Sequence, residues 1–481
     1  MTTTRPDAPG TSGTRPGTSP AVTAVEALLA RAAEVEPLIS SICTTNPVAL
    51  DDAHRLDAEL TAGHRRGPLH GVPVLVKDNI DTAGLATTAG SLALADVPPP
   101  AADAPLVARL REAGCVILGK TNLSEWANFR GHTSSSGWSG YGGLTRNPYA
   151  LNRSAGGSSS GSGAALAARL APLAVGTETN GSIVCPAALN GVVGIKPSVG
   201  LVPQQGIVPI SHSQDTAGPM ALTVREAAQL LTVLAGGATD YAAWCDGADL
   251  TGVRIGVPRG TAFWGTQAGL DAVTEQSLEL LSRAGATLVD PVTLPETSYE
   301  DQLVVLCHEL KAGMASYLSD RAGAPKTLAD LIAFNNDHAE SELTHFGQEL
   351  FERSEATRGL AAAEYVAARL ACLDAGRNGI DRALREHELD ALVMPGYPPA
   401  WTIDLVNGDQ VNGGNCSMHA ALAGYPLVSV PSGMVAGLPV AITFSGGYHT
   451  DGTLIRLAHA FELARSSSYG PMPEPEFTQW S

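Results

Sequence analysis

The stretch GGSSSGSGAALAARLAPLAVGTETNGSIVCPAALNGVVGIKPSVG, residues 156–200, decides the fold class. Its start is rich in Gly and Ser and leads directly into AALAARLA (164–171), which has the composition of a small-residue helix. The apolar run 172–179 predicts a strand, residues 180–191 predict a turn with a short helix, and 192–198 predict another strand. Strands that alternate with helices predict an α/β fold with a substantially parallel core.

Upstream of this stretch, the sequence predicts that the ordered chain begins near Ala21, where apolar residues recur at helical spacing. GVPVLVKDNI (71–80) is a short β-rich run that ends in polar residues, so Lys77 is expected at the end of a strand. CVILG (115–119) predicts a buried strand. TNLSEWANF (121–129) opens with a residue type that caps helices, and it predicts a helix.

Downstream, residues 303–390 have amphipathic helical patterns, and residues 452–465 predict a closing helix. No linker divides the chain and no repeat of fixed period occurs, so we predict a single domain over residues 21–470. The flanking segments 1–20 and 471–481 are predicted to be tails. The first is rich in Thr, Pro and Gly and is expected to be disordered.

Composition excludes several classes of protein. The chain has 481 residues, of which 44% are apolar and 16% are charged, and its net charge is −18. This length and apolar content suffice for a large buried core. The negative charge argues against nucleic-acid and membrane partners, because phosphates would be repelled. No run of 18 apolar residues predicts a transmembrane helix, and the N-terminus lacks the apolar segment of a secretion signal.

Seven cysteines are dispersed along the sequence without a CxxC pair and without the spacing of a zinc site. An odd, scattered set is typical of reduced thiols, so we expect a cytoplasmic protein. No cluster of residues suggests a metal site, and we predict no metal and no cofactor.

Residues 114–121, GCVILGKT, match the phosphate-binding pattern GxxxxGK[ST]. That site needs a Gly-rich loop which wraps a phosphate between a strand and a helix. The four intervening residues are Cys, Val, Ile and Leu, which favour a buried strand. We therefore reject a nucleotide site.

Residues 157–161, GSSSG, match the nucleophile elbow GxSxG of α/β-hydrolases, with Ser159 as the nucleophile. An elbow follows a strong strand, and RNPYALNRSAG (146–156) is a poor one. The class also needs an acid and then a His further along the chain. With twelve histidines a candidate can always be found, so we disfavour this interpretation but leave it open.

A third and longer match covers residues 156–200. It resembles the amidase signature family, whose pattern is a Gly-Gly-Ser-Ser block, a helix and a strand, a Gly-Gly-Ser turn and a Gly-(Ile/Leu)-Lys-Pro strand. The order Lys77, Ser158, Ser182 and the spacing of 24 residues between the two serines agree with that family. Similarity spans roughly residues 25–465, and segments such as KTNLSEWANFRG, SQDTAGPM and PAWTIDLVNGD are most similar to bacterial peptide amidases.

The resemblance implies the amidase-signature fold, an α/β fold with a large mixed, mostly parallel central sheet covered by helices on both faces. It also implies a Ser-Ser-Lys catalytic triad. Ser182 would attack the amide carbonyl, and Lys77 would be the base. Ser158, which the family holds in place by a cis peptide bond, would relay the proton between them. A lysine with the ordinary pKa of about 10.4 is protonated at neutral pH, but burial lowers this value. The apolar run before Lys77 is consistent with such burial.

The turn around the proposed nucleophile is implied to bind the oxyanion through the backbone N–H groups of Thr179, Asn180, Gly181 and Ser182. The family most often has Gly where this chain has Asn180, and Asn tolerates a positive φ better than other non-Gly residues. Glu178 stands where the family commonly has Asp. We expect its carboxylate to be structural and to bond amides of the loop.

Four aromatic residues are candidates for the lining of a substrate cleft: Trp126, Trp138, Tyr141 and Trp401. Each is explained equally well as an ordinary core aromatic. The Gly/Ser-rich stretch 131–145 is the candidate wall on the acyl side of the substrate.

The sequence thus predicts a cofactor-free amide hydrolase that releases ammonia or an amine through an acyl-serine intermediate. The favoured substrate is the C-terminal amide of a peptide or an amino acid. Three alternatives stay open: a general aliphatic or aryl-acylamidase, the amidotransferase subunit that makes ammonia for Gln-tRNA synthesis, and an inactive homologue that only binds. We expect a monomer or a homodimer.

Overall fold

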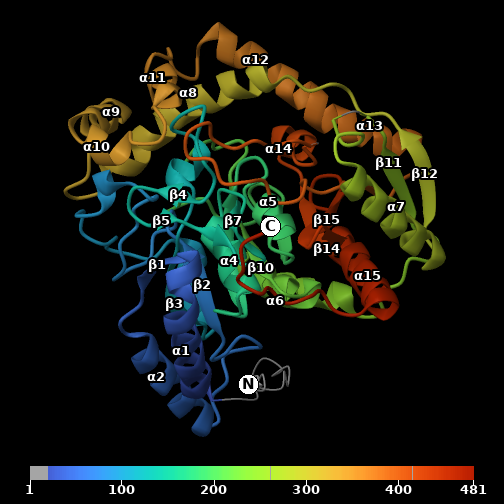
Figure 1. Ribbon diagram of the computed structural model, residues 1–481, viewed down its shortest axis with the longest axis horizontal. Helices are drawn as coiled ribbons and strands as arrows, with labels where there is room; N and C mark the ends of the chain where they lie inside the picture. The colour runs from blue at the N-terminus through green and yellow to red at the C-terminus, as the bar shows by residue number, and fades with distance from the viewer. Residues whose placement is uncertain (1–19, 261, 414, 481) are drawn as a thin grey trace, which may run out of the picture.

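An eleven-stranded sheet runs through the centre of the computed structural model, which describes residues 20–260, 262–413 and 415–480 (Figure 1). The strand order is β1-β3-β2-β8-β10-β9-β14-β15-β13-β11-β12. Its strands are β1 (Ile42–Thr45), β2 (Pro73–Lys77), β3 (Val116–Thr121), β8 (Leu173–Glu178), β9 (Val193–Lys196), β10 (Thr216–Ala221), β11 (Arg254–Pro258), β12 (Thr287–Val292), β13 (Ala391–Pro395), β14 (Leu427–Val435) and β15 (Leu438–Ser445). Two separate pairs are β4 (Trp138–Ser139) with β5 (Gly143–Leu144) and β6 (Arg146–Asn147) with β7 (Ala150–Ser154).

The sheet is mixed, as predicted, but the expectation that it is mostly parallel is wrong. Four of its ten pairings are parallel, those of β2 with β3 and β8 and those of β11 with β12 and β13. The other six are antiparallel. Alternation of strands and helices along a sequence does not fix strand direction. The β14–β15 hairpin shows this, since it turns through just Ala436 and Gly437, both at positive φ.

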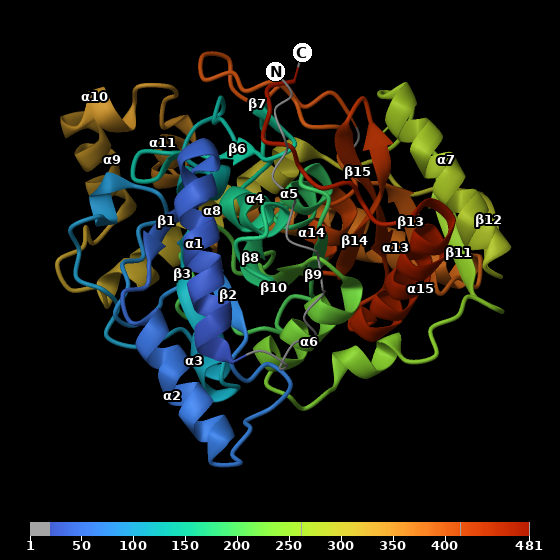
Figure 2. The same cartoon turned by 60° about the horizontal axis from the view of Figure 1, so that its bottom comes forward.

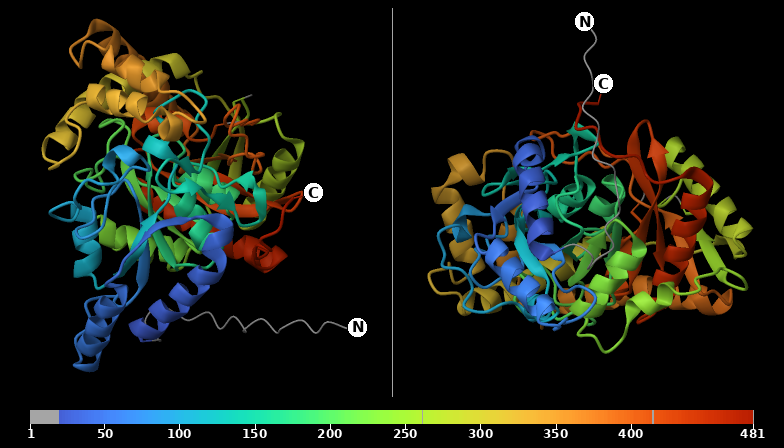
Figure 3. Two further views of the ribbon diagram at one scale, coloured as in Figure 1. Left: turned by 60° about the vertical axis from the view of Figure 1, so that its left-hand side comes forward. Right: turned by 90° about the horizontal axis from the view of Figure 1, so that it is seen from below.

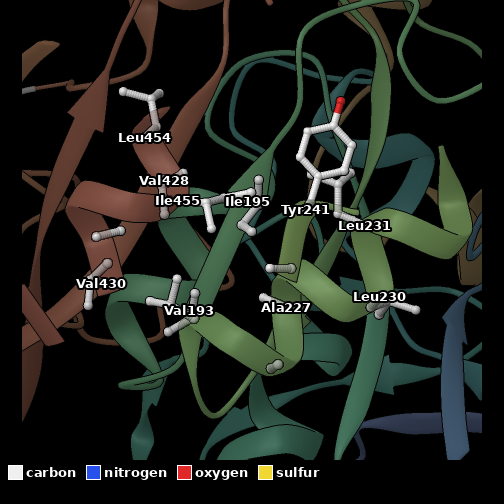
Figure 4. Packing of buried hydrophobic residues seen from close by; sticks show 14 of the residues in the cluster. Val193, Ile195, Ala227, Leu230, Leu231, Tyr241, Val428, Val430, Leu454 and Ile455 are labelled. Atoms are coloured by element: carbon white, nitrogen blue, oxygen red, sulfur yellow. The ribbon is translucent and has the colours of Figure 1, made fainter. Parts of the chain in front are cut away.

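Helices cover both faces of the sheet, as predicted. On one face lie α3 (Pro105–Glu112), α6 (Val224–Leu234), α7 (Ala268–Arg283) and α15 (Asp451–Tyr469). Figure 4 shows how this layer packs, with Ile195 of β9 beside side chains of α6 and α15 such as Leu231 and Ile455. All three side chains are completely buried, so this contact forms part of the main apolar core.

The opposite face carries α1 (Ala21–Ile39), α2 (Ala49–Thr61), α4 (Ser160–Ala167), α5 (Val184–Leu189), α13 (Gly379–Glu386) and α14 (Met418–Ala423). Figure 2 shows α1 and α2 at the β2–β3 side of the sheet. Every residue of α4 is buried. A Cβ atom on Gly161 would overlap the backbone of Asn122, so the Gly/Ser composition of this region permits close packing and does not mark a linker.

A helical segment, α8 (Tyr299–Ser319) to α12 (Ala363–Leu373), packs on loops that leave the sheet. Figure 3 shows it at the opposite end of the molecule from α1 and α2. Its other members are α9 (Leu328–Asp337), α10 (Ala339–Glu342) and α11 (Glu349–Glu355). The described residues also form short 3₁₀ turns, η1 (Leu92–Leu94), η2 (Glu125–Asn128) and η3 (Tyr241–Cys245), and a π-helical turn, η4 (Asp374–Asn378).

The helix predicted over residues 121–129 is not formed. Strand β3 continues through Thr121, and the short turn η2 follows it. Within η2, Trp126, Ala127 and Asn128 have φ values of 47°, 54° and 68°, a left-handed conformation that L-residues seldom adopt in succession. Tertiary contacts hold this turn, because the Trp126 ring packs edge-on against Phe351. The helix prediction is therefore wrong.

The predicted tails differ in what can be described. Residues 1–19 of the N-terminal tail lie outside the described residues. Residues 471–480 form no helix or strand and lie against β7. The Leu151 N–H donates to Thr478, and Asn152 and Trp480 exchange two hydrogen bonds of 2.9 and 3.0 Å.

All seven cysteines are free thiols, and six of them are buried. In the ranges that the structure describes, no helix combines the length and the apolar character needed to cross a lipid bilayer.

Candidate active site

Lys77 lies at the carboxyl end of β2, next to the parallel strand β8. Its side chain is completely buried. The Nζ atom lies 2.8 Å from Ser158 Oγ and 3.0 Å from Ser159 Oγ. It also lies 2.9 Å from Thr177 Oγ1 and 3.3 Å from the Thr177 carbonyl oxygen. The amine therefore sits among hydroxyl groups that can exchange protons with it.

The ionisation of Lys77 is strongly perturbed. Burial lowers the pKa of its ammonium to about 7, while the carboxylates of Glu178 and Asp215 oppose this shift. A lysine with this pKa is substantially neutral at neutral pH, so it can act there as a base.

Ser158 and Ser159 lie between β7 and α4, and both are completely buried. The peptide bond between Gly157 and Ser158 is cis, as the resemblance implies. The Ser159 hydroxyl donates to the Thr177 carbonyl (3.1 Å), and the Ser159 N–H donates to the Ser182 carbonyl (3.1 Å). The preceding strand β7 pairs with β6 outside the central sheet. A nucleophile elbow needs an exposed serine after a central strand, so this geometry disfavours that interpretation.

Ser182 lies in the turn between β8 and α5. It is 9% exposed, whereas Lys77 and Ser158 are 0% exposed, so among these three residues Ser182 alone has access to solvent. Gly181 before it has φ 85°, and a Cβ atom there would overlap the Tyr397 hydroxyl. Both observations explain why the turn requires Gly at this position.

Glu178 stabilises this turn through hydrogen bonds to its backbone. Its Oε2 atom accepts hydrogen bonds from the N–H groups of Ile183 (2.7 Å) and Val184 (3.0 Å). The expectation that Glu178 bonds loop amides is confirmed. A carboxylate at this position also suits the positive end of α5.

Sequence reasoning missed two groups of residues around the turn. Asp215 is buried and accepts a hydrogen bond from the Thr179 hydroxyl (2.6 Å). It lies in the quoted segment SQDTAGPM, but only the pairing of Thr216 with Glu178 in the sheet brings it opposite Thr179. The sequence therefore gave no signal that Asp215 contacts Thr179.

The second missed group forms hydrogen bonds with the Asn180 side chain. Asn180 accepts a hydrogen bond from the Ser417 hydroxyl (2.5 Å) and donates one to Gln302 (3.1 Å). Ser417 also lies 3.0 Å from the Tyr397 hydroxyl. Gln302 of α8 and Ser417, the residue before α14, thus contact the nucleophile turn although they are far apart in the sequence.

The four candidate substrate aromatics occupy different surroundings. Trp126 packs on Phe351, Trp138 packs edge-on against His345 and Phe346, and Trp401 donates to Asp409 (2.8 Å). These three indoles are 7% exposed or less. Tyr141 is partly exposed, and its hydroxyl lies 3.4 Å from that of Thr44. These ring and hydrogen-bond contacts are with residues other than Lys77, Ser158 and Ser182.

Residues 116–121 of the rejected phosphate motif form the buried strand β3. Lys120 pairs with Asp78 at 3.3 Å and donates to the Ile80 carbonyl (2.7 Å). Its charge is therefore used inside the protein. Within the described ranges, no group of three or more His, Cys, Asp and Glu side chains is placed to hold a metal ion.

Residues 23–455 match the family model described as Amidase. The chain belongs to the amidase family. The native peptide amidase from Stenotrophomonas maltophilia is 47% identical, with 96% of each chain covered and a TM-score of 0.90. A probable amidase of Arabidopsis thaliana is 37% identical over 92% of this chain and 86% of that relative. A glutamyl-tRNA(Gln) amidotransferase subunit of Symbiobacterium thermophilum is 38% identical over 92% of this chain and 93% of that relative.

These relationships confirm the predicted amidase signature family and its similarity to peptide amidases. The mixed sheet with its helices is the fold of amidase signature enzymes, and the chain is an amide-hydrolysing enzyme.

Proposed function

We propose that this amidase hydrolyses the C-terminal amide of peptides or amino acids through an acyl-serine intermediate, with Lys77, Ser158 and Ser182 as its catalytic triad. One observation carries the triad proposal: the Lys77 amine is buried, faces hydroxyl groups, and has its pKa lowered by burial to about 7.

In this mechanism neutral Lys77 accepts the hydroxyl proton of Ser158, whose Oγ lies 2.8 Å from its Nζ. Ser158 takes the proton of Ser182 as the Ser182 oxygen bonds to the amide carbon. The relay then returns the proton to the leaving nitrogen, the C–N bond breaks, and ammonia departs. Water attacks the resulting ester through the same relay, which releases the carboxylic acid and restores Ser182.

We propose that the N–H groups of Thr179, Asn180, Gly181 and Ser182 stabilise the oxyanion. In the described structure, the N–H groups of Asn180, Gly181 and Ser182 donate to no backbone carbonyl, so they are available to bind the oxyanion. One preorganised donor of this kind contributes about 2.7–4 kcal/mol to the transition state.

A probe for reactive serines tests the nucleophile. A fluorophosphonate should label the wild-type enzyme at Ser182, and Ser182→Ala should remain unlabelled. Ser159→Ala is the matched control, because Ser159 is also a buried serine next to Lys77, and it should still be labelled. Labelling of Ser182→Ala together with loss of labelling in Ser159→Ala would revive the elbow interpretation.

The similarity to a peptide amidase supports the peptide-amide substrate. A primary amide leaves as ammonia, whereas an internal peptide bond has a chain on the leaving side. A leaving-group pocket closed by the GTETNGS turn (176–182) and the Lys77 loop would admit the ammonia leaving group and clash with a peptide chain. Mass spectrometry of an amidated hexapeptide should show one conversion from amide to acid. Internal fragments would contradict the closed pocket, and turnover restricted to acetamide or anilides would favour a general amidase.

The similarity to an amidotransferase subunit keeps a second function in view. That role requires partner chains, whereas we propose a monomer or a homodimer that works alone. The free cysteines support a reducing, cytoplasmic location. Release of ammonia from glutamine but not from amidated peptides, by a protein that co-purifies with partner chains, would favour the amidotransferase.

A further inference from the structure

We propose that Asp215 is a positioning residue of the hydrolytic site, which fixes the nucleophile turn through the Thr179 hydroxyl and acts on Lys77 through its buried negative charge. This inference rests on the proposed function of Lys77 and Ser182, and it assigns a role to a residue outside the triad.

The sheet brings Asp215 to this position. Strands β8 and β10 run antiparallel, and Glu178 pairs with Thr216 at the end of their contact. Thr179 directly follows β8 and Asp215 directly precedes β10, so the two residues meet just beyond the paired strands. The Thr179 hydroxyl donates to Asp215 Oδ1 at 2.6 Å. Side chains opposite each other on antiparallel strands restrain each other's rotamers.

The carboxylate itself is held rigidly. Its Oδ2 atom accepts the N–H groups of Ile210 (2.8 Å) and Ser211 (2.9 Å), and the residue is 8% exposed. Asp215 therefore anchors Thr179 to the 210–215 loop. Because Thr179 is three residues before Ser182 and its N–H is a proposed oxyanion donor, this anchor restrains the geometry of the proposed oxyanion site.

The charge of Asp215 reaches Lys77. Two carboxylates raise the pKa of Lys77 against the effect of burial, that of Glu178 and that of Asp215. Glu178 is committed to the α5 amides. Burial raises the pKa of Asp215 itself to about 6, and the neighbouring Glu309 of α8 acts in the same direction. His212 of the same loop is a further titratable group and faces Glu309 at 3.4 Å.

The sign of the expected pH effect follows from these charges. Neutral Lys77 is the active form, and a nearby negative charge favours its protonated form. Removal of the Asp215 charge should therefore lower the pKa of Lys77 and extend activity to lower pH. A residue that acted purely through packing would change the rate but would not shift the pH range in which activity rises.

The test measures the rate of fluorophosphonate labelling of Ser182 between about pH 5 and pH 10. Asp215→Asn should move the acid limb of the profile to lower pH by about half a unit to one unit. Asp451→Asn is the matched control. Asp451 is likewise buried and bonded to a hydroxyl and an N–H, those of Ser198, but its charge acts on Lys196. The acid limb of the Asp451→Asn profile should coincide with that of the wild type.

A second pair of variants tests the hydrogen bond and does not depend on folding of Asp215→Asn. Thr179→Val keeps the shape but loses the hydroxyl, and it should slow labelling on the alkaline plateau by about tenfold to a hundredfold. Thr179→Ser keeps the hydroxyl and should recover most of this loss. An unmoved limb in folded Asp215→Asn, or a Thr179→Ser variant as slow as Thr179→Val, would overturn the inference. Failure of the wild type to label at Ser182 would instead overturn the proposed function.

Discussion

Lys77 and Lys120 are two buried lysines on neighbouring parallel strands, and their surroundings differ in one decisive respect. In the pairing of β2 with β3, Lys120 lies beside Val76 and Lys77 beside Thr121. Both side chains are completely buried. Lys120 faces the Asp78 carboxylate at 3.3 Å, whereas the contacts of Lys77 Nζ are three hydroxyls and one carbonyl.

The contrast shows that one residue type has two different surroundings in one sheet. A carboxylate at ion-pair distance stabilises the charged form of a lysine, which then cross-links loops. Hydroxyl groups provide no compensating charge, so burial dominates and releases the proton. The carboxylates that act on Lys77, Glu178 and Asp215, are instead hydrogen-bonded to other groups.

Removal of Lys77 should have the strongest effect on activity. Lys77→Ala should reduce kcat/KM by about 10³–10⁶-fold, and the double variant Lys77→Ala/Ser158→Ala should lose little more, because the proposed triad would work as a unit. Initial-rate measurements on an amidated peptide check this. Independent, multiplying losses in the double variant would contradict a shared relay.

The second prediction concerns stability. Lys120→Met leaves Asp78 buried without its cation and should lower the free energy of unfolding by about 3–5 kcal/mol. Lys196→Met is the matched control. It removes a third buried lysine, which donates to the carbonyls of Tyr425 and Ala420 and has no carboxylate at ion-pair distance in the described ranges, so the loss should be smaller. Urea denaturation measures both variants, and equal losses would show that the ion pair is not what distinguishes Lys120.

The third prediction uses the pH dependence of stability. Unfolded Lys77 binds a proton below its ordinary pKa of 10.5, and the folded residue binds it below about 7. The unfolded state therefore binds more protons between these values, so the Lys77 contribution makes stability rise from pH 7 to pH 10.5. Relative to Lys77→Met, the wild type should become more stable across this window. A constant difference in urea midpoints would show that the pKa of Lys77 is not lowered.

The fourth prediction concerns the pH profile of catalysis. If neutral Lys77 is the base, as proposed, kcat/KM should increase about tenfold per pH unit below pH 7 and level off above it. Initial rates over a range of buffers test this. A maximum near pH 4 would indicate a carboxylate base and would end the comparison of the two lysines as base and structural cation.

The smallest expected effect is none. Prolonged EDTA treatment should leave the activity unchanged, since the proposed relay uses only Lys77 and hydroxyl groups. Activity that is lost with EDTA and restored by zinc would overturn the relay.

The order Lys77, Ser158, Ser182 was available from the sequence because short segments hold each residue in a recognisable local pattern. Local patterning also predicted that Lys77 ends a strand, and β2 does end there. The left-handed turn at Trp126 was missed, because its conformation depends on packing against Phe351, which lies 225 residues away in the chain.

Contiguous motifs are enough to predict the family, the α/β class and the residue types of the candidate triad. Three features depend on contacts between distant parts of the chain: strand direction, the burial that lowers the pKa of Lys77, and the hydrogen bonds of Asp215 with Thr179 and of Ser417 with Asn180. The physical reason is that desolvation and hydrogen bonding depend on distances in space. Pairing across the sheet and packing of distant helices set those distances, and no local pattern encodes them.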